Sequence, residues 1–486
     1  MMSNRFFRKV GFGLSPQEDI PADPLAWAVE QVTEIPPLIW PEKQYTVAEM
    51  LVFREQFLLA EKELEQSVRD QNLLRKEREK IYQKYGRHYF ESYELAIRHH
   101  QAVASRDAVF DRFQHFWGNH FAIVDKIKMP TFNTGAYQRE TIRLNMDKRF
   151  ADLVIAATLS FPMMRALDNF LSRGPNSIFG KNNKGKKNVN GLNENHGREL
   201  LELHTVSPQA GYTQEDVVNA AYILTGWGMW DGDRKGSEGK EVTFEPSVHE
   251  PGTHKVLGRK YKPGKSNGQQ GANQLKNLVE DLCSSPECIS FISHKLCCHF
   301  ICDEPTQLMI NHVSAAWVKS EGHLIQIHTA VLEATFKWGS EYQKFQSPET
   351  WLLQTARMLG GDWPGSPLEF KFDFQSNPNN IMRQPARVLS ELGHLPFRAQ
   401  QPNGFPDDVK SWLSPEYLVR RLAIANDARR LGILSKTSEV SENLESALLK
   451  NFDDQNFWTN LKANITSNNP NDLVTAFMCS KEVLNS

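Results

Sequence analysis

Apolar residues recur at the spacing of helices along most of the chain, and this pattern predicts an all-α fold. The stretch 45–106 is long, charged and almost free of glycine and proline, so we expect two long helices that separate near Gly86. Its charges are typical of a solvated helix face. Further helices are predicted over residues 107–121, 139–171, 272–283, 286–302, 306–321, 325–337 and 348–359. We expect a large helical domain with long loop insertions.

Two stretches interrupt this helical pattern. Residues 172–192 are rich in glycine, asparagine and lysine and predict an exposed loop. The insertion 231–271 contains EVTFEP and HKVLGRKY, which have β character and are expected to pair as one small β-hairpin. We therefore predict a single large helical domain over residues 1–438 and a helical, polar C-terminal tail over residues 439–486.

The stretch NENHGRELLELHTV, residues 193–206, carries an unusual density of charge. Asn193 is a good N-cap, and Glu194 lies in the first turn, where the helix dipole favours a negative charge. At about 100° per residue, the charged side chains share one arc and the leucines cover the other. An ordinary amphipathic surface helix explains most of these charges. It does not explain His204, which falls on the leucine side.

A second helix follows with its own start and stop signals. Thr213 and Asp216 have the spacing of a capping box, and Gly226 ends the apolar stripe. Trp227 comes directly after this stop, which places an aromatic side chain at a turn.

Several polar residues stand where helix amphipathicity does not require them. The candidate acid–base residues are Arg198, Glu199, Glu202, His204 and His120. The candidate ligand-binding residues are Asp168, Asn169, Glu194, Trp227 and His249. Polar groups at the ends of several helices can line one pocket, and a carboxylate pair held by an arginine can perform acid–base chemistry. The alternative is a buried structural network in which Arg198 bonds Glu202 and Asp168.

A divalent metal is a candidate cofactor, but the sequence selects none. The order His196-x-x-Glu199-x-x-Glu202 reverses the Glu-x-x-His order of di-iron helices. An oxygen- and nitrogen-rich ligand set would suit Mn, Fe or Zn. Five of the six cysteines fall within residues 283–302, without a C-x-x-C pair. Apolar residues at helical spacing favour a buried helix there over a metal site or a Cys283–Cys288 disulfide.

Composition narrows the classes of partner. The chain has 486 residues and a formal net charge of -2, which gives no support for nucleic-acid binding. No apolar run reaches the roughly 18 residues that a membrane span needs. The first residues are basic but lack the apolar segment of a secretory signal, so we expect a cytoplasmic chain.

The central stretches also support a resemblance. NENHGRELLELHTV followed by AGYTQEDVVNAAYILTGW resembles the signature of a bacterial family, domain of unknown function 1800 (DUF1800). RKVGFGLSP, FWGNHFA, FPMMRALDN, HEPGTHKVLG, ISHKLCCHFICDEP and GFPDDVKSWLS resemble further elements of that family in the same order. His196 stands where the family usually has tyrosine, Gly118 where histidine is common, and Glu250 where aspartate is common.

The resemblance implies little about activity, because the family has no settled one. Its genes often lie beside those of a sulfatase- or alkaline-phosphatase-like family (DUF1501-type) with a twin-arginine export signal. This implies a sulfatase-like partner, and a periplasmic location if the folded partner carries the chain across. Two functions stay open: a hydrolase-like enzyme, metal-assisted or not, with its site around the helix 193–206, and a non-catalytic partner or maturation companion. A pure scaffold is the third alternative.

Overall fold

The computed structural model describes residues 4–84, 87–124, 129–185, 191–228, 242–264, 271–367, 384–434, 440–454, 456–463, 465 and 470–486. Helices dominate these residues, and the strands form two small antiparallel sheets of two strands each. The all-α prediction is therefore confirmed. None of the described helices combines the length and apolar character that crossing a membrane requires.

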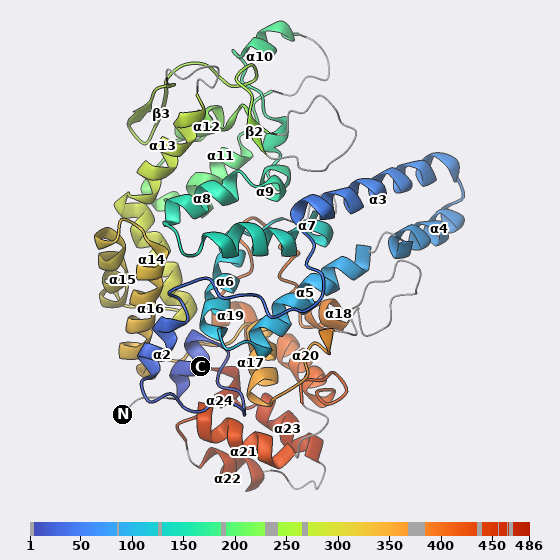
Figure 1. Ribbon diagram of the computed structural model, residues 1–486, viewed down its shortest axis with the longest axis vertical. Coiled ribbons are helices and arrows are strands. Elements are labelled where there is room, and N and C mark those ends of the chain that lie inside the picture. Colours follow the sequence, from blue (N-terminus) through green and yellow to red (C-terminus); the bar gives the residue numbers. More distant parts are fainter. Residues whose placement is uncertain are drawn as a thin grey trace.

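The helices follow one another through short connections in most of the chain (Figure 1). The first half contains α1 (Arg5–Val10), α2 (Pro24–Glu30), α3 (Val47–Ser67), α4 (Gln71–Lys84), α5 (Arg87–Ala104), α6 (Ala108–His120), α7 (Met129–Tyr137), α8 (Phe150–Thr158), α9 (Phe161–Ala166), α10 (Ile178–Asn182), α11 (Asn195–Glu199) and α12 (Gln214–Leu224). The second half contains α13 (Ala272–Cys283), α14 (Pro286–Phe300), α15 (Gln307–Lys319), α16 (Leu324–Trp338), α17 (Pro348–Met358), α18 (Gln384–Glu391), α19 (Val409–Trp412), α20 (Pro415–Asn426), α21 (Val440–Asn451), α22 (Phe457–Ala463), α23 (Pro470–Met478) and α24 (Lys481–Leu484).

The charged stretch 45–106 forms three helices, α3 to α5, so the prediction of two is wrong. The additional break lies at residues 68–70, where Val68 is extended and Asp70 caps α4. The Asp70 carboxylate accepts the backbone N–H of Leu73 at 2.8 Å. This allows α3 and α4 to project side by side from the body of the molecule (Figure 1). Gly86 lies outside the described residues.

Buried apolar side chains form three clusters. The largest joins α1, α6, α8 and α12 to α16, and the smallest lies at the base of the α3–α4 pair. A third cluster joins α17 to the C-terminal helices through residues such as Leu444 and Phe477. Residues after 438 thus bury apolar side chains of their own. The division at 438/439 stays a prediction.

The end of the chain lies against the segment that precedes α17. The backbone N–H of Lys344 donates to the carbonyl of Ser486 at 2.7 Å, and the N–H of Ser486 donates back at 2.8 Å. Phe345 and Asn485 form an isolated antiparallel bridge. The segment 344–346 is therefore held by the final residues of the chain.

The prediction that the two β-like stretches of the insertion pair with each other is wrong. The sheets consist of β1 (Trp227–Gly228) with β2 (Thr243–Phe244) and of β3 (His254–Val256) with β4 (Arg259–Tyr261). HKVLGRKY alone forms a hairpin, because Leu257 and Gly258 both adopt positive φ (47° and 81°) and reverse the chain. EVTFEP instead pairs with the residues that follow α12.

The central stretch 193–206 is not one regular helix. It forms α11 and then a π-helical turn, η4 (Leu200–His204). In this wider turn the backbone N–H of Val206 donates to the carbonyl of Leu201, five residues earlier, at 3.0 Å. The Asn193 side chain accepts the N–H of Asn195 at 2.9 Å, although Glu194 is the residue at the cap. The uniform rotation of 100° per residue therefore fails in the second half.

Candidate functional site

The predicted carboxylates of the central stretch belong to a surface network. Arg198 donates to Gln214 at 2.8 Å and lies 3.6 Å from the Glu194 carboxylate. Glu202 accepts the Tyr212 hydroxyl at 2.8 Å, and Glu199 is half-buried on the same helix. These contacts tie α11 to the start of α12.

Two of the predicted ligand-binding residues, His249 and Asn169, fasten the turn after α12. His249 lies 2.7 Å from the Thr225 carbonyl oxygen through Nδ1 and 2.9 Å from Gln274 Oε1 through Nε2. Asn169 donates to the Leu224 carbonyl at 3.2 Å and to that of Trp227 at 3.5 Å. Asp168 precedes it in the left-handed conformation, with φ 57°. These contacts give the residues a structural part in closing the turn.

Two of the predicted acid–base residues do come together in the interior. The His120 and His204 rings are 6.3 Å apart, and His120 Nε2 donates to the His204 carbonyl at 3.3 Å. Lys295 donates to His120 Nδ1 at 3.0 Å. The His204 ring nitrogens have no hydrogen-bond partner among the residues that the structure describes, and burial lowers the pKa of His204 to about 3. The structure thus separates these two histidines, which are buried, from Glu194, Arg198 and Glu202, which are not.

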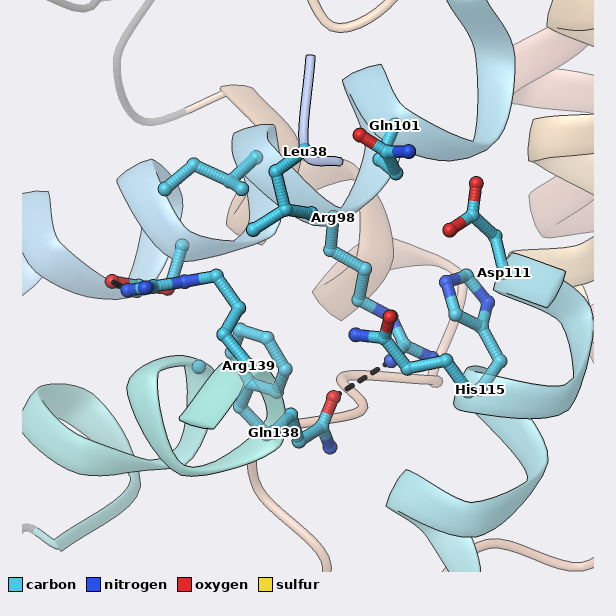
Figure 2. Close-up of a pocket in the computed structure, with 12 residues that line it drawn as sticks. Leu38, Arg98, Gln101, Asp111, His115, Gln138 and Arg139 are labelled. Atoms are coloured by element: carbon cyan, nitrogen blue, oxygen red, sulfur yellow. Dashed lines mark hydrogen bonds and ion pairs between the residues drawn. The ribbon is translucent and has the colours of Figure 1, made fainter. Parts of the chain in front are cut away.

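A denser polar site lies between α5, α6 and α17, where no acid–base residue was predicted. Arg98, His115 and Gln138 line two adjoining hollows there. Figure 2 shows the first hollow, with Arg98 Nη1 donating to Gln138 Oε1 at 2.8 Å. Opposite charges also pair in its wall, where Arg139 donates to Glu94 at 2.6 and 3.1 Å. Gln138 and Arg139 begin a second π-helical turn, η1 (Gln138–Ile142).

The second hollow is small, with a cavity volume of about 40 Å³, and it is lined from α6, α14, α17 and the segment 394–407. Arg98 holds Glu349 with two hydrogen bonds, of 2.8 and 3.0 Å, and both side chains are buried. Burial alone would raise the pKa of Glu349, but Arg98, His99 and His115 hold it well below its usual range. Glu349 is therefore a fixed negative charge.

An aspartate–histidine pair occupies the other side of this hollow. His299 Nδ1 lies 2.6 Å from Asp407 Oδ2, and His299 Nε2 has no hydrogen-bond partner among the residues described. Burial lowers the pKa of His299 to about 4 although Asp407 acts to raise it. Asp407 stays ionised, because His299 and Lys344 outweigh the effect of burial and keep its pKa far below the usual value.

Lys344 and Arg112 add positive charge beside this pair. The Lys344 ammonium donates to Asp303 at 2.6 Å and to the backbone carbonyl of Asp407. Arg112 donates to the Thr350 hydroxyl at 2.6 Å, while its Nε has no partner in the described part of the chain. Burial lowers the pKa of Arg112 to about 10, so the group is still charged at neutral pH. The hollow thus combines a neutral imidazole with a buried cation.

The sequence contained a signal for this site that the prediction did not use. ISHKLCCHFICDEP carries His299 and Asp303, and GFPDDVKSWLS carries Asp407. Both stretches belong to the family resemblance, but the apolar spacing of the first predicts only a buried helix. Lys344 and Glu349 had no comparable local signal.

One departure from the family pattern lies in the wall of the site. A side chain at Gly118 would meet the amide of Gln138 at 2.8 Å, so Gln138 fills the space beside this glycine. A second departure, Glu250, fastens the loop 172–192 by accepting the N–H of Asn176 at 2.8 Å.

The structure also bears on the metal site and the disulfide considered from the sequence. No group of three or more His, Cys, Asp or Glu side chains could hold a metal ion within the described ranges. All six cysteines are free thiols, including Cys283 and Cys288.

Comparison with known proteins identifies one family. The family model described as "Protein of unknown function (DUF1800)" matches residues 5–482, which is nearly the whole chain. No curated protein and no solved structure matches the chain.

Proposed function

We propose that this chain, which belongs to the DUF1800 family, is a hydrolytic enzyme with His299 as its general base. The observation that carries the proposal is the 2.6 Å contact between Asp407 and His299 Nδ1, with Nε2 unpaired at a polar hollow. This contact supports the second hollow, rather than the helix 193–206, as the proposed reaction centre. The acid–base roles predicted for Glu199, Glu202 and His204 stay predictions.

Asp407 fixes the protonation state of the histidine. An ionised carboxylate only accepts hydrogen bonds, so the ring proton lies on Nδ1 and the lone pair on Nε2. Lys344 holds the Asp407 backbone in place, which orients the carboxylate toward the ring. His299 Nε2 can therefore accept a proton from a water molecule that attacks a bound substrate.

Arg112 supplies the charge that such a reaction requires. When water attacks an ester-like centre, negative charge develops on the oxygen of that centre, and a fixed cation in a water-poor site stabilises it. Arg112 is buried beside the aspartate–histidine pair, and no described residue pairs with its Nε. Arg98 is less suited to this role because Glu349 already engages it twice.

The purified full chain should be assayed against chromogenic p-nitrophenyl esters, phosphates, sulfates and glycosides. We expect turnover of at least one class, and His299→Gln should lower kcat by roughly 100-fold or more. Since burial holds the pKa of His299 to about 4, kcat/KM should be flat between about pH 6 and 8.

His294→Gln is the matched control, because this exposed ring lies on the same helix α14. It should leave kcat unchanged. The proposal fails if His299→Gln is as active as the wild type, or if the wild type turns over none of the four classes.

The second candidate function comes from the resemblance. A sulfatase-like partner, and periplasmic export together with it, stay proposals that a native pull-down from cells tests. The projecting α3–α4 pair is the feature that favours such a role, since it stands clear of the body (Figure 1). Failure of the two proteins to co-purify would count against it.

A further inference from the structure

A third hollow, which shares no lining residue with the polar site, lies where α13 and α15 end. It is lined by the last residues of both helices, by the start of α8 and by the turn 321–322, and its cavity volume is about 390 Å³. Its floor is apolar: Phe150, Ile289 and Trp317 are all buried. A pocket with an apolar floor and a few polar groups at its rim is the usual form of a small-molecule site.

The backbone around this hollow is fixed. The N–H of Phe150 donates to the Gly322 carbonyl at 2.8 Å, and Arg149 forms an antiparallel bridge with His323. The pocket is therefore formed before any ligand arrives.

The rim is negatively charged on balance. Arg149 is engaged by Glu280 at 2.5 and 3.0 Å and lies 3.5 Å from Asp152. Arg259 is engaged by Asp281 at 2.5 Å. Among the charged residues that line the hollow, Glu280, Asp281 and Glu321 carry carboxylates and Arg149 carries a guanidinium group, so negative charge is in excess. The two helix C-termini add to this, because the C-terminal end of a helix carries a partial negative charge.

Glu321 is the rim carboxylate left over by this pairing. It is exposed, and the described residues provide neither a hydrogen bond nor an ion pair to its carboxylate. Its backbone has φ 54°, a left-handed conformation that costs a non-glycine residue free energy. The fold thus holds an unpaired carboxylate at the mouth of an apolar pocket.

From this combination we infer a binding site for an apolar or aromatic amine, separate from the proposed reaction centre. The hydrocarbon part of the ligand would lie on Trp317 and Ile289, and its ammonium group would face Glu321. A ligand with a carboxylate in place of the ammonium group would bind more weakly, because the surplus negative charge of the rim would repel it.

Isothermal titration of the full chain with n-hexylamine, n-octylamine, octanoate and octanol tests this assignment. Octylamine should bind saturably and more tightly than octanoate or octanol. Its affinity should exceed that of hexylamine by about fourfold per added methylene, because each buried methylene contributes about 0.8 kcal/mol. Equal binding of octanoate or octanol would overturn the charge assignment, and an affinity independent of chain length would overturn the apolar floor.

Two variants locate the ligand. Glu321→Gln should weaken octylamine by roughly fivefold, as expected for one charge a few ångströms away. Ser284→Trp, at an exposed lining position, should block the hollow and abolish binding. Glu445→Gln, an exposed carboxylate on α21, is the control and should have no effect. If Glu445→Gln weakens octylamine as much as Glu321→Gln, general charge attraction explains the binding and the site is refuted.

Discussion

At the scale of single residues, the polar site is governed by the opposition of burial and pairing. A buried carboxylate is costly unless a partner compensates it, and Glu349 is compensated by two hydrogen bonds from Arg98. His299 shows the reverse balance, because burial outweighs the pull of Asp407 and keeps the ring neutral. The same hollow therefore holds a permanent anion, Glu349, and a neutral base, His299.

Glu349→Gln should be strongly destabilising. It leaves the Arg98 guanidinium buried without a counter-charge, which typically costs about 3–5 kcal/mol of unfolding free energy. Urea unfolding followed by circular dichroism measures this difference. Glu445→Gln, at an exposed position, should change the unfolding free energy by less than about 0.5 kcal/mol. A loss for Glu349→Gln no larger than that of the control would show that the pair contributes nothing.

At the scale of elements, local signals and long-range contacts determine different features. The capping box of α12 follows from two residues three positions apart and is confirmed: Asp216 N–H donates to Thr213 Oγ1 at 3.2 Å, and Thr213 N–H donates to the Asp216 carboxylate at 2.8 Å. The π-helical turn η4 leaves no such local pattern, because its wider turn depends on how the segment packs.

Thr213→Ala tests the contribution of this cap. The substitution removes the acceptor for the Asp216 N–H and should lower the unfolding free energy by about 1 kcal/mol. Thr213→Ser keeps the hydroxyl and should lose much less. Equal losses for the two variants would assign the effect to the methyl group instead of the hydrogen bond.

The same distinction explains how much could be predicted. Helix positions and the α12 cap depend on neighbours in sequence, so the all-α fold was accessible from the pattern alone. The His299–Asp407 contact joins residues 108 positions apart, and Arg98–Glu349 joins residues 251 positions apart. Nothing in local spacing indicates such pairs. The charges of residues 193–206 are conspicuous because they lie close together in the sequence. In the structure Gln214 bonds Arg198 and Tyr212 bonds Glu202, so local contacts explain much of this charge density.

At the scale of the whole molecule, buried neutral histidines recur throughout the core. Burial lowers the pKa of His196, His204 and His328 to about 3 and that of His299 and His394 to about 4, from an ordinary value of 6.5. Between about pH 4 and 6.5, these histidines are therefore protonated in the unfolded chain but neutral in the folded chain. Stability from these residues is complete above pH 6.5 and is lost as the pH falls toward their folded values.

The protein should thus be acid-labile well above the pH at which its carboxylates titrate. Each such histidine lowers the unfolding free energy by up to about 1.4 kcal/mol per pH unit below pH 6.5. The urea midpoint should be constant from about pH 8 to 7 and fall steeply by pH 5.5. His204→Gln should reduce this slope. A midpoint unchanged down to pH 5.5 would contradict the burial of these rings as neutral groups.

The antiparallel contact between segment 344–346 and the chain end joins residues 140 positions apart in the sequence. Ser486 and Leu484 accept the N–H groups of Lys344 and Gln346, and the Lys344 side chain reaches Asp407. Residues 484–486 therefore help to fix Lys344, and through Lys344 they help to fix Asp407, which orients His299. Deletion of residues 484–486 would remove these contacts without removing any residue that lines the hollow, and it should therefore lower activity through the position of Asp407 alone.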